Sequence, residues 1–193
     1  MSLLELIAAA DERGLAASAV ACLDRCLPRP AEGFDPDPVR PLWAGCADGS
    51  GWPDRLAEVR AALDAAADTD GAAPQIRKLL GEAPVDRAAP GLREWADACS
   101  LAALEIHQQF DTPGGDTTAD DTDLLRRCRT GDPGGGGPLV TGELRRQIQI
   151  LETLAETTGT VGGGAALRRV LDLSTEGRRV LRAVVSRQAR GRA

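Results

Sequence analysis

The sequence predicts an all-α protein, a single-domain bundle of about six to eight helices with long Gly/Pro-rich loops. The first observation is the kind of apolar residue: the chain of 193 residues holds 32 Ala and 24 Leu but only 10 Val and 5 Ile. Ala and Leu favour helices, whereas β-branched residues favour strands. The second observation is spacing, because apolar residues recur every three or four positions in several segments, as on one face of a helix. A chain of this length suits one domain, residues 1–193.

Turn residues divide the first half of the chain into helices. Residues 3–27 are expected to form two helices with a break at Gly14. The segment 28–51 carries five prolines and four glycines, which predicts a long flexible connection near 28–52. A helix is then expected to begin at Pro53, since proline suits the first turn, and a short helix follows at 74–80.

The second half should contain the longer helices. A stripe of Leu, Trp, Cys, Ala, Ile and Phe predicts a helix over 89–110, and a short helix is expected to end at Arg129. The glycine-rich segments near 111–121 and 131–138 are expected to be flexible loops. Two further helices complete the prediction, at about 140–157 and about 164–190.

The charge is distributed unevenly. The net charge is −6, but residues 1–123 hold 10 basic and 23 acidic side chains, whereas residues 124–193 hold 13 basic and 6 acidic ones. Such a division indicates either an acid–base contact within the fold or a basic surface that faces a partner.

The closing helix is amphipathic. Its apolar positions form one stripe: Leu167, Val170, Leu173, Val180, Leu181, Val184 and Val185. Its arginines fall on the opposite side and form the candidate contact surface: Arg168, Arg169, Arg178, Arg179, Arg182, Arg187 and Arg190. Three interpretations stay open for this side: a solvated helix face, a surface docked on acidic groups of this chain or of a partner, and a nucleic-acid surface. No aromatic residues interleave the arginines for base stacking, which disfavours nucleic acid.

Motifs for catalysis or metal binding are incomplete. His107 is the only histidine, and with Asp111 one turn later it is more typical of a helix-end hydrogen bond than of a general base. Cys22, Cys26 and Cys46 lack an evident fourth metal ligand, and the sole lysine, Lys78, does not follow a phosphate-binding glycine loop. We therefore expect no catalytic residue, no cofactor and no metal.

Two weaker patterns concern DNA and calcium. Ala10 and Gly14 stand at helix-turn-helix spacing, but the following segment offers few side chains for a base edge. The acids Asp116, Asp120, Asp121 and Asp123 do not meet the glycine and glutamate positions of a calcium loop. Both segments are interpreted structurally.

These observations predict a cytoplasmic, non-catalytic protein-interaction or regulatory protein of a GC-rich bacterium, with the arginine side of the last helix as its contact surface. Signal-peptide features are missing at the start, and five scattered cysteines fit reduced thiols. The expected partner is another protein or a second copy of the chain. No association with a membrane is expected. A nucleic-acid-associated regulator that uses the same helix is the alternative, and an enzyme of unrecognised type comes third.

Overall fold

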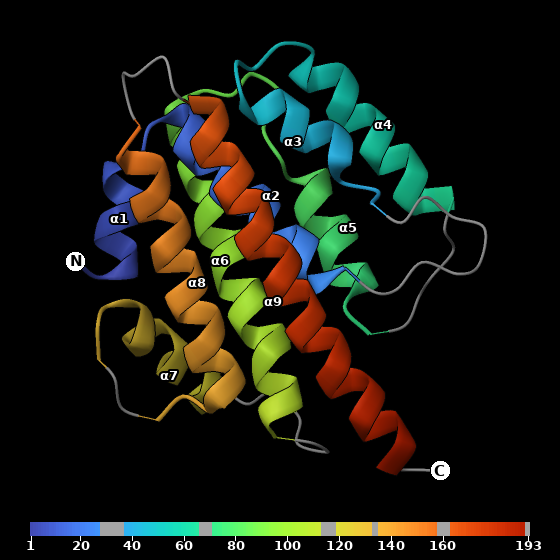
Figure 1. Ribbon diagram of the computed structural model, residues 1–193, viewed down its shortest axis with the longest axis vertical. Helices are drawn as coiled ribbons and strands as arrows, with labels where there is room; N and C mark the ends of the chain where they lie inside the picture. The colour runs from blue at the N-terminus through green and yellow to red at the C-terminus, as the bar shows by residue number, and fades with distance from the viewer. Residues whose placement is uncertain (28–36, 66–70, 113–118, 133–134, 158–162, 192–193) are drawn as a thin grey trace.

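The chain folds as an all-α bundle, and the described residues contain nine helices and no strand (Figure 1). The computed structural model describes residues 1–27, 37–65, 71–112, 119–132, 135–157 and 163–191. The helices are α1 (Leu3–Ala9), α2 (Glu12–Cys26), α3 (Arg40–Cys46), α4 (Trp52–Ala65), α5 (Ala73–Gly81), α6 (Ala89–Asp111), α7 (Ala119–Arg129), α8 (Pro138–Ala155) and α9 (Gly163–Gly191).

Helix α2 is the centre of the bundle. The Asp11 side chain caps its first turn by accepting a hydrogen bond from the Gly14 amide at 2.7 Å. Every residue from Gly14 to Cys26 is buried, because small and apolar side chains occupy all sides of the helix. It packs chiefly against α6 and α9, and α8 closes the bundle against both of those helices.

Helices α3, α4 and α5 form a smaller group beside this bundle (Figure 1). Two tryptophans attach the group to α6. The indole N–H of Trp52 donates to the Pro84 carbonyl at 2.9 Å, and that of Trp95 donates to the Leu79 carbonyl at 2.8 Å. The centroids of their rings lie 6.0 Å apart in an edge-to-face arrangement. Each tryptophan therefore both donates a hydrogen bond and packs its ring against the other.

The long helices lie where the sequence predicts them, but three local predictions are wrong. The first break falls at Ala10, where α1 ends, and Gly14 belongs to the first turn of α2. The predicted connection near 28–52 contains α3, and the helices number nine within the described ranges instead of six to eight. The described loops are mostly short; residues 28–36, 113–118 and 133–134 lie outside the described residues.

No helix in the described part of the chain combines the length and apolarity needed to cross a lipid bilayer.

Candidate functional site

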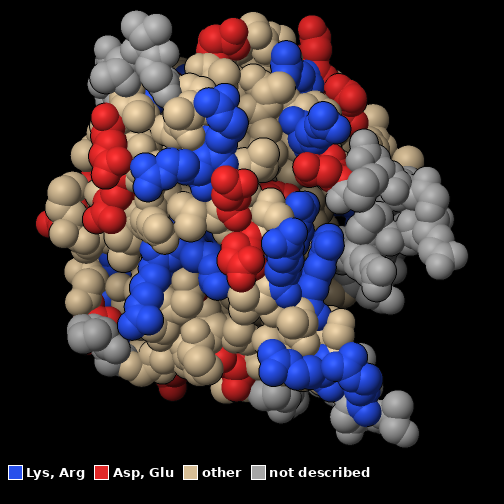
Figure 2. Space-filling view, viewed as in Figure 1, with Lys and Arg blue, Asp and Glu red and all other residues tan. Residues whose placement is uncertain are grey.

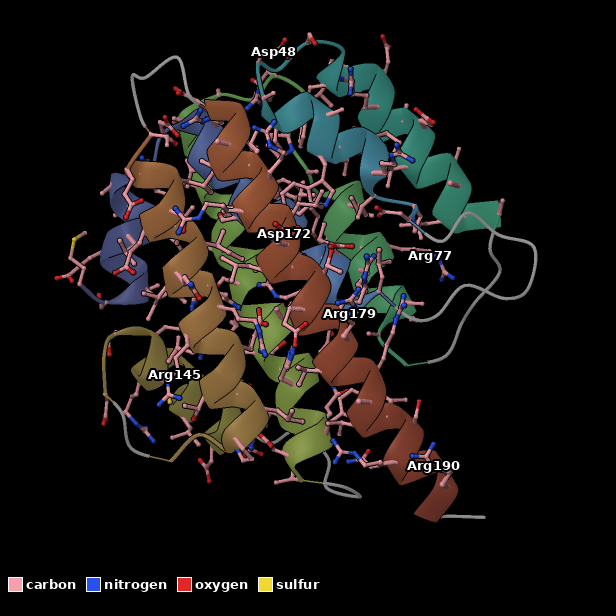
Figure 3. All side chains as sticks on the ribbon, viewed as in Figure 1. Asp48, Arg77, Arg145, Asp172, Arg179 and Arg190 are labelled. Carbon is pink, nitrogen blue, oxygen red and sulfur yellow. The ribbon has the colours of Figure 1, made fainter. Side chains whose placement is uncertain are left out.

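The outer side of α9 carries five exposed arginines, which we call the arginine face: Arg168, Arg169, Arg179, Arg187 and Arg190. Figure 2 shows the basic side chains spread over α8 and α9, with acidic side chains among them. Asp172 and Glu176 are also exposed on α9, and Figure 3 labels Asp172, Arg179 and Arg190 along it. Among the described residues, the face makes one ion pair, from Arg179 to Glu176 at 3.9 Å. Most of its charge is therefore exposed to solvent.

Arg178 differs from its neighbours on the predicted face. Its guanidinium donates to Asp24 Oδ1 at 2.8 Å, and the Ser174 hydroxyl donates to Asp24 Oδ2 at 2.6 Å. Asp24 and Ser174 are fully buried, and the Arg178 side chain is only 14% exposed. These three residues form the α2–α9 clasp. Arg178 therefore docks on an acidic group of this chain. Arg182 is also half-buried.

The apolar stripe of α9 is buried along only part of its length. Val170 and Leu181 lie in the core, whereas Leu167, Leu173 and Val184 are half-buried and Val185 is 41% exposed. Beyond Leu181 the helix still touches the end of α6, where the Gln188 side-chain amide donates to the Phe110 carbonyl at 3.0 Å, and it ends at the lower right of Figure 1. The end of α9 therefore presents both apolar and basic side chains to solvent.

No family model, curated protein or solved structure matches this chain.

A second candidate is a buried polar network at the junction of α2, α6 and α8. Arg25 and Glu143 are fully buried and form a two-point ion pair, with Nε to Oε2 at 2.8 Å and Nη2 to Oε1 at 2.5 Å. The Gln147 amide donates to Glu143 Oε1 at 2.9 Å, and the Ser100 hydroxyl donates to Gln147 Oε1 at 2.6 Å. One terminal nitrogen of Arg25, Nη1, has no hydrogen-bond partner among the described residues.

His107 completes this network, and its environment keeps it neutral. Its Nδ1 donates a hydrogen bond to the Ala103 carbonyl at 2.7 Å. Its Nε2 lies 3.6 Å from Glu143 Oε2. Burial lowers the pKa of His107 below its usual value, although Glu143 opposes that shift. Burial alone would raise the pKa of Glu143, but Arg25 and then His107 hold it below the usual value. The carboxylate is therefore charged and balanced by Arg25.

These shifts predict that acid destabilises the protein. The unfolded chain binds a proton at His107 more readily than the folded one, so the free energy of unfolding should fall as pH drops below about 6.5. Protonation of Glu143 also favours the unfolded chain, so the free energy of unfolding should fall further below about pH 4.5. Urea unfolding between about pH 7.5 and about pH 5 measures the first step.

The His107→Gln variant is the control, because it removes the only imidazole from the chain. Its stability should vary much less with pH over the same window. Stability that stays constant or rises as the wild-type protein is acidified through this window would contradict the assignment of a neutral, buried His107.

Gly177 lets α9 cross the buried network closely. A Cβ atom at this position would collide with Cδ of Arg25 and would stand 3.0 Å from Cδ of Arg146. Real Cβ contacts are longer than this, so any larger residue would displace Arg25 or lift α9. This close approach explains why a glycine stands among the apolar residues of α9.

The cysteines, the acidic loop and the segment after Gly14 do not form a site within the described residues. All five cysteines are free and buried, and burial raises the pKa of Cys22 and of Cys46 to about 12. Within the described residues, no three His, Cys, Asp or Glu side chains gather as a metal site. Asp116 lies outside the described residues. After Gly14, the polar residues Ser18 and Arg25 are buried in α2, where neither can reach a DNA base edge or phosphate.

A hollow of about 430 Å³ lies between α1, the start of α2 and the end of α8. Its lining includes apolar side chains such as Leu6, Leu151 and Leu154. Two exposed carboxylates, Glu152 and Glu156, also border it, and they make no ion pair among the described residues. The sequence alone did not indicate this hollow, because its walls come from residues 1–14 and 151–156, which are distant in the chain.

Proposed function

We propose that this protein is a non-catalytic interaction protein whose arginine face binds an acidic surface of a partner protein. The observation that carries the proposal is the set of five exposed arginines on one helix, of which only Arg179 has an ion pair among the described residues. Arginine suits this role because its guanidinium binds carboxylates at two points and is weakly hydrated.

A rigid support strengthens the proposal. Helix α9 is held to α2 by the clasp of Asp24, Ser174 and Arg178 and rests on the buried network through Gly177. The arginine face is therefore presented by a fixed helix instead of a mobile tail, which lowers the entropic cost of binding.

A protein partner fits better than nucleic acid. Asp172 and Glu176 lie among the arginines, where they would repel phosphates but could accept hydrogen bonds from a protein. The chain as a whole also carries a net charge of −6, which opposes association with a polyanion.

The test is affinity capture from the native host with the wild-type protein and two variants. One variant, Arg168→Gln/Arg179→Gln/Arg190→Gln, neutralises three residues of the arginine face. The control, Lys78→Gln/Arg126→Gln/Arg127→Gln, neutralises three exposed charges on α5 and α7. Exposed ion pairs contribute about 0.5 kcal/mol each, so the first variant should bind the captured partner about ten-fold more weakly. The control should bind like the wild type.

Two results would contradict the proposal. One is equal loss of binding in both variants, which would indicate a general charge effect. The other is a partner that proves to be DNA or RNA, with affinity that falls steeply with salt and a slope that shrinks in the first variant alone.

A further inference from the structure

The hollow between α1, α2 and α8 has a preformed apolar floor. Its volume of about 430 Å³ lies within the range of small-molecule sites. Leu6, Leu151 and Leu154 line it, and all three belong to the hydrophobic core of the bundle. Because close packing in the core fixes these side chains, the floor keeps its shape without a ligand. The hollow can therefore receive an apolar group without rearrangement of the helices.

The charged side chains around this floor are all acidic. Asp11, Glu152 and Glu156 line the hollow, and no lysine or arginine side chain does. Glu152 and Glu156 are exposed and make no ion pair among the described residues, and Asp11 caps α2 through Oδ1 alone. Arg13 lies close in the sequence, but it donates to the Thr157 hydroxyl at 3.0 Å and does not line the hollow. The hollow therefore attracts positive charge.

The floor and the charge together select the chemistry of the ligand. A bare metal ion does not suit the hollow, because within the described residues no three His, Cys, Asp or Glu side chains gather closely enough to hold one. An anion would be repelled by the carboxylates, and a wholly apolar molecule would leave their charge unused. A molecule with an apolar body and one positively charged group matches both features.

We propose that the hollow binds a small organic cation, a primary amine with an apolar body. The body rests on Leu6, Leu151 and Leu154, and the ammonium group faces Glu152 and Glu156 at the rim. Burial of the apolar body provides the driving force, and the carboxylates provide the selectivity for a cation. The inference goes beyond the proposed function, because the hollow shares no residue with the arginine face.

Titration of the isotopically labelled protein with hexylamine tests the proposal, with backbone amide chemical shifts as the measurement. Hexylamine carries an ammonium group on an apolar chain at neutral pH. The amides that shift should lie in residues 6–14 and 151–156, which line the hollow. Hexanol, which has the same chain without the charge, should bind about ten-fold more weakly, and hexanoate should bind more weakly still.

Three variants locate the site. The rim variant, Glu152→Gln/Glu156→Gln, should raise the Kd for hexylamine about ten-fold, which corresponds to about 1.4 kcal/mol for two exposed ion pairs. The control variant, Glu58→Gln/Asp64→Asn, removes two exposed acids from α4 and should bind like the wild type. The filling variant, Ala9→Phe, adds a ring at an exposed position that lines the hollow and should abolish binding. Circular dichroism checks that each variant keeps its helices.

Several results would overturn the proposal. They are hexanol that binds as tightly as hexylamine, a rim variant that binds like the wild type, shifted amides that lie elsewhere, and no saturable binding of hexylamine. Amides of the hollow that shift with protein concentration alone would instead assign the hollow to a second copy of the chain. The proposed function is tested separately, because the variant of the arginine face should bind hexylamine like the wild type.

Discussion

Replacing Glu143 by Ala should lower the free energy of unfolding by about 3–5 kcal/mol, the cost of breaking a buried ion pair by removing one partner. The carboxylate accepts three of the four side-chain hydrogen bonds that Arg25 donates, and both side chains are fully buried. Without it, Arg25 keeps a charge in the core with no opposite charge against it. Chemical denaturation monitored by circular dichroism measures the loss.

Two further variants give this prediction its controls. Glu152→Ala removes an exposed glutamate from the same helix and should change stability by no more than about 0.5 kcal/mol. The double variant Arg25→Met/Glu143→Leu removes both charges together and should recover most of the lost stability, because apolar residues of similar volume can replace a buried pair. If Glu143→Ala costs no more than Glu152→Ala, the buried pair does not hold the bundle together.

The long helices could be predicted from the sequence because their signals are local. Glycines, prolines and apolar spacing mark the ends of α6, α8 and α9 within a few residues. The segment that contains α3 is rich in proline, which predicts a loop, yet Pro41 lies in the first turn of that helix, where no amide donor is needed. A glycine at position 14 predicts a break, but the Gly14 amide donates to the Asp11 side chain that caps α2.

The buried network could not be predicted in full, because its partners are distant in sequence. Arg25 and Glu143 are separated by 118 residues, and no local pattern pairs them. One signal was present: Glu143 and Gln147 occupy the same side of α8 as the buried Val140, Ile150 and Leu154. A charge in register with core positions needs a buried partner, which points to an opposite charge on another buried helix face.

The same limit applies to the arginines of α9. Arg178 and Arg179 are adjacent, and the periodicity of one helix assigned both to the outer side. What separates them is Asp24 on α2, which lies against Arg178 and leaves Arg179 exposed. Only the packing of α9 on α2 decides which arginine supports the fold and which stays exposed to solvent.

Arg178→Ala should therefore lower the free energy of unfolding by about 3 kcal/mol, because it leaves the fully buried carboxylate of Asp24 without its cation. Arg179→Ala is the matched control. It removes the adjacent arginine, whose side chain is 74% exposed and whose ion pair with Glu176 spans 3.9 Å, so its effect on stability should stay within about 0.5 kcal/mol.

Thermal and urea unfolding of both variants, combined with the capture assay, separates structure from binding. Arg178→Ala should weaken partner binding only in proportion to the loosening of α9, and should regain binding under conditions that restore the fold, such as lower temperature. Arg179→Ala should weaken binding while the fold stays intact. Equal destabilisation by both variants would contradict the division of the arginines into one that clasps α9 to α2 and five that face outward.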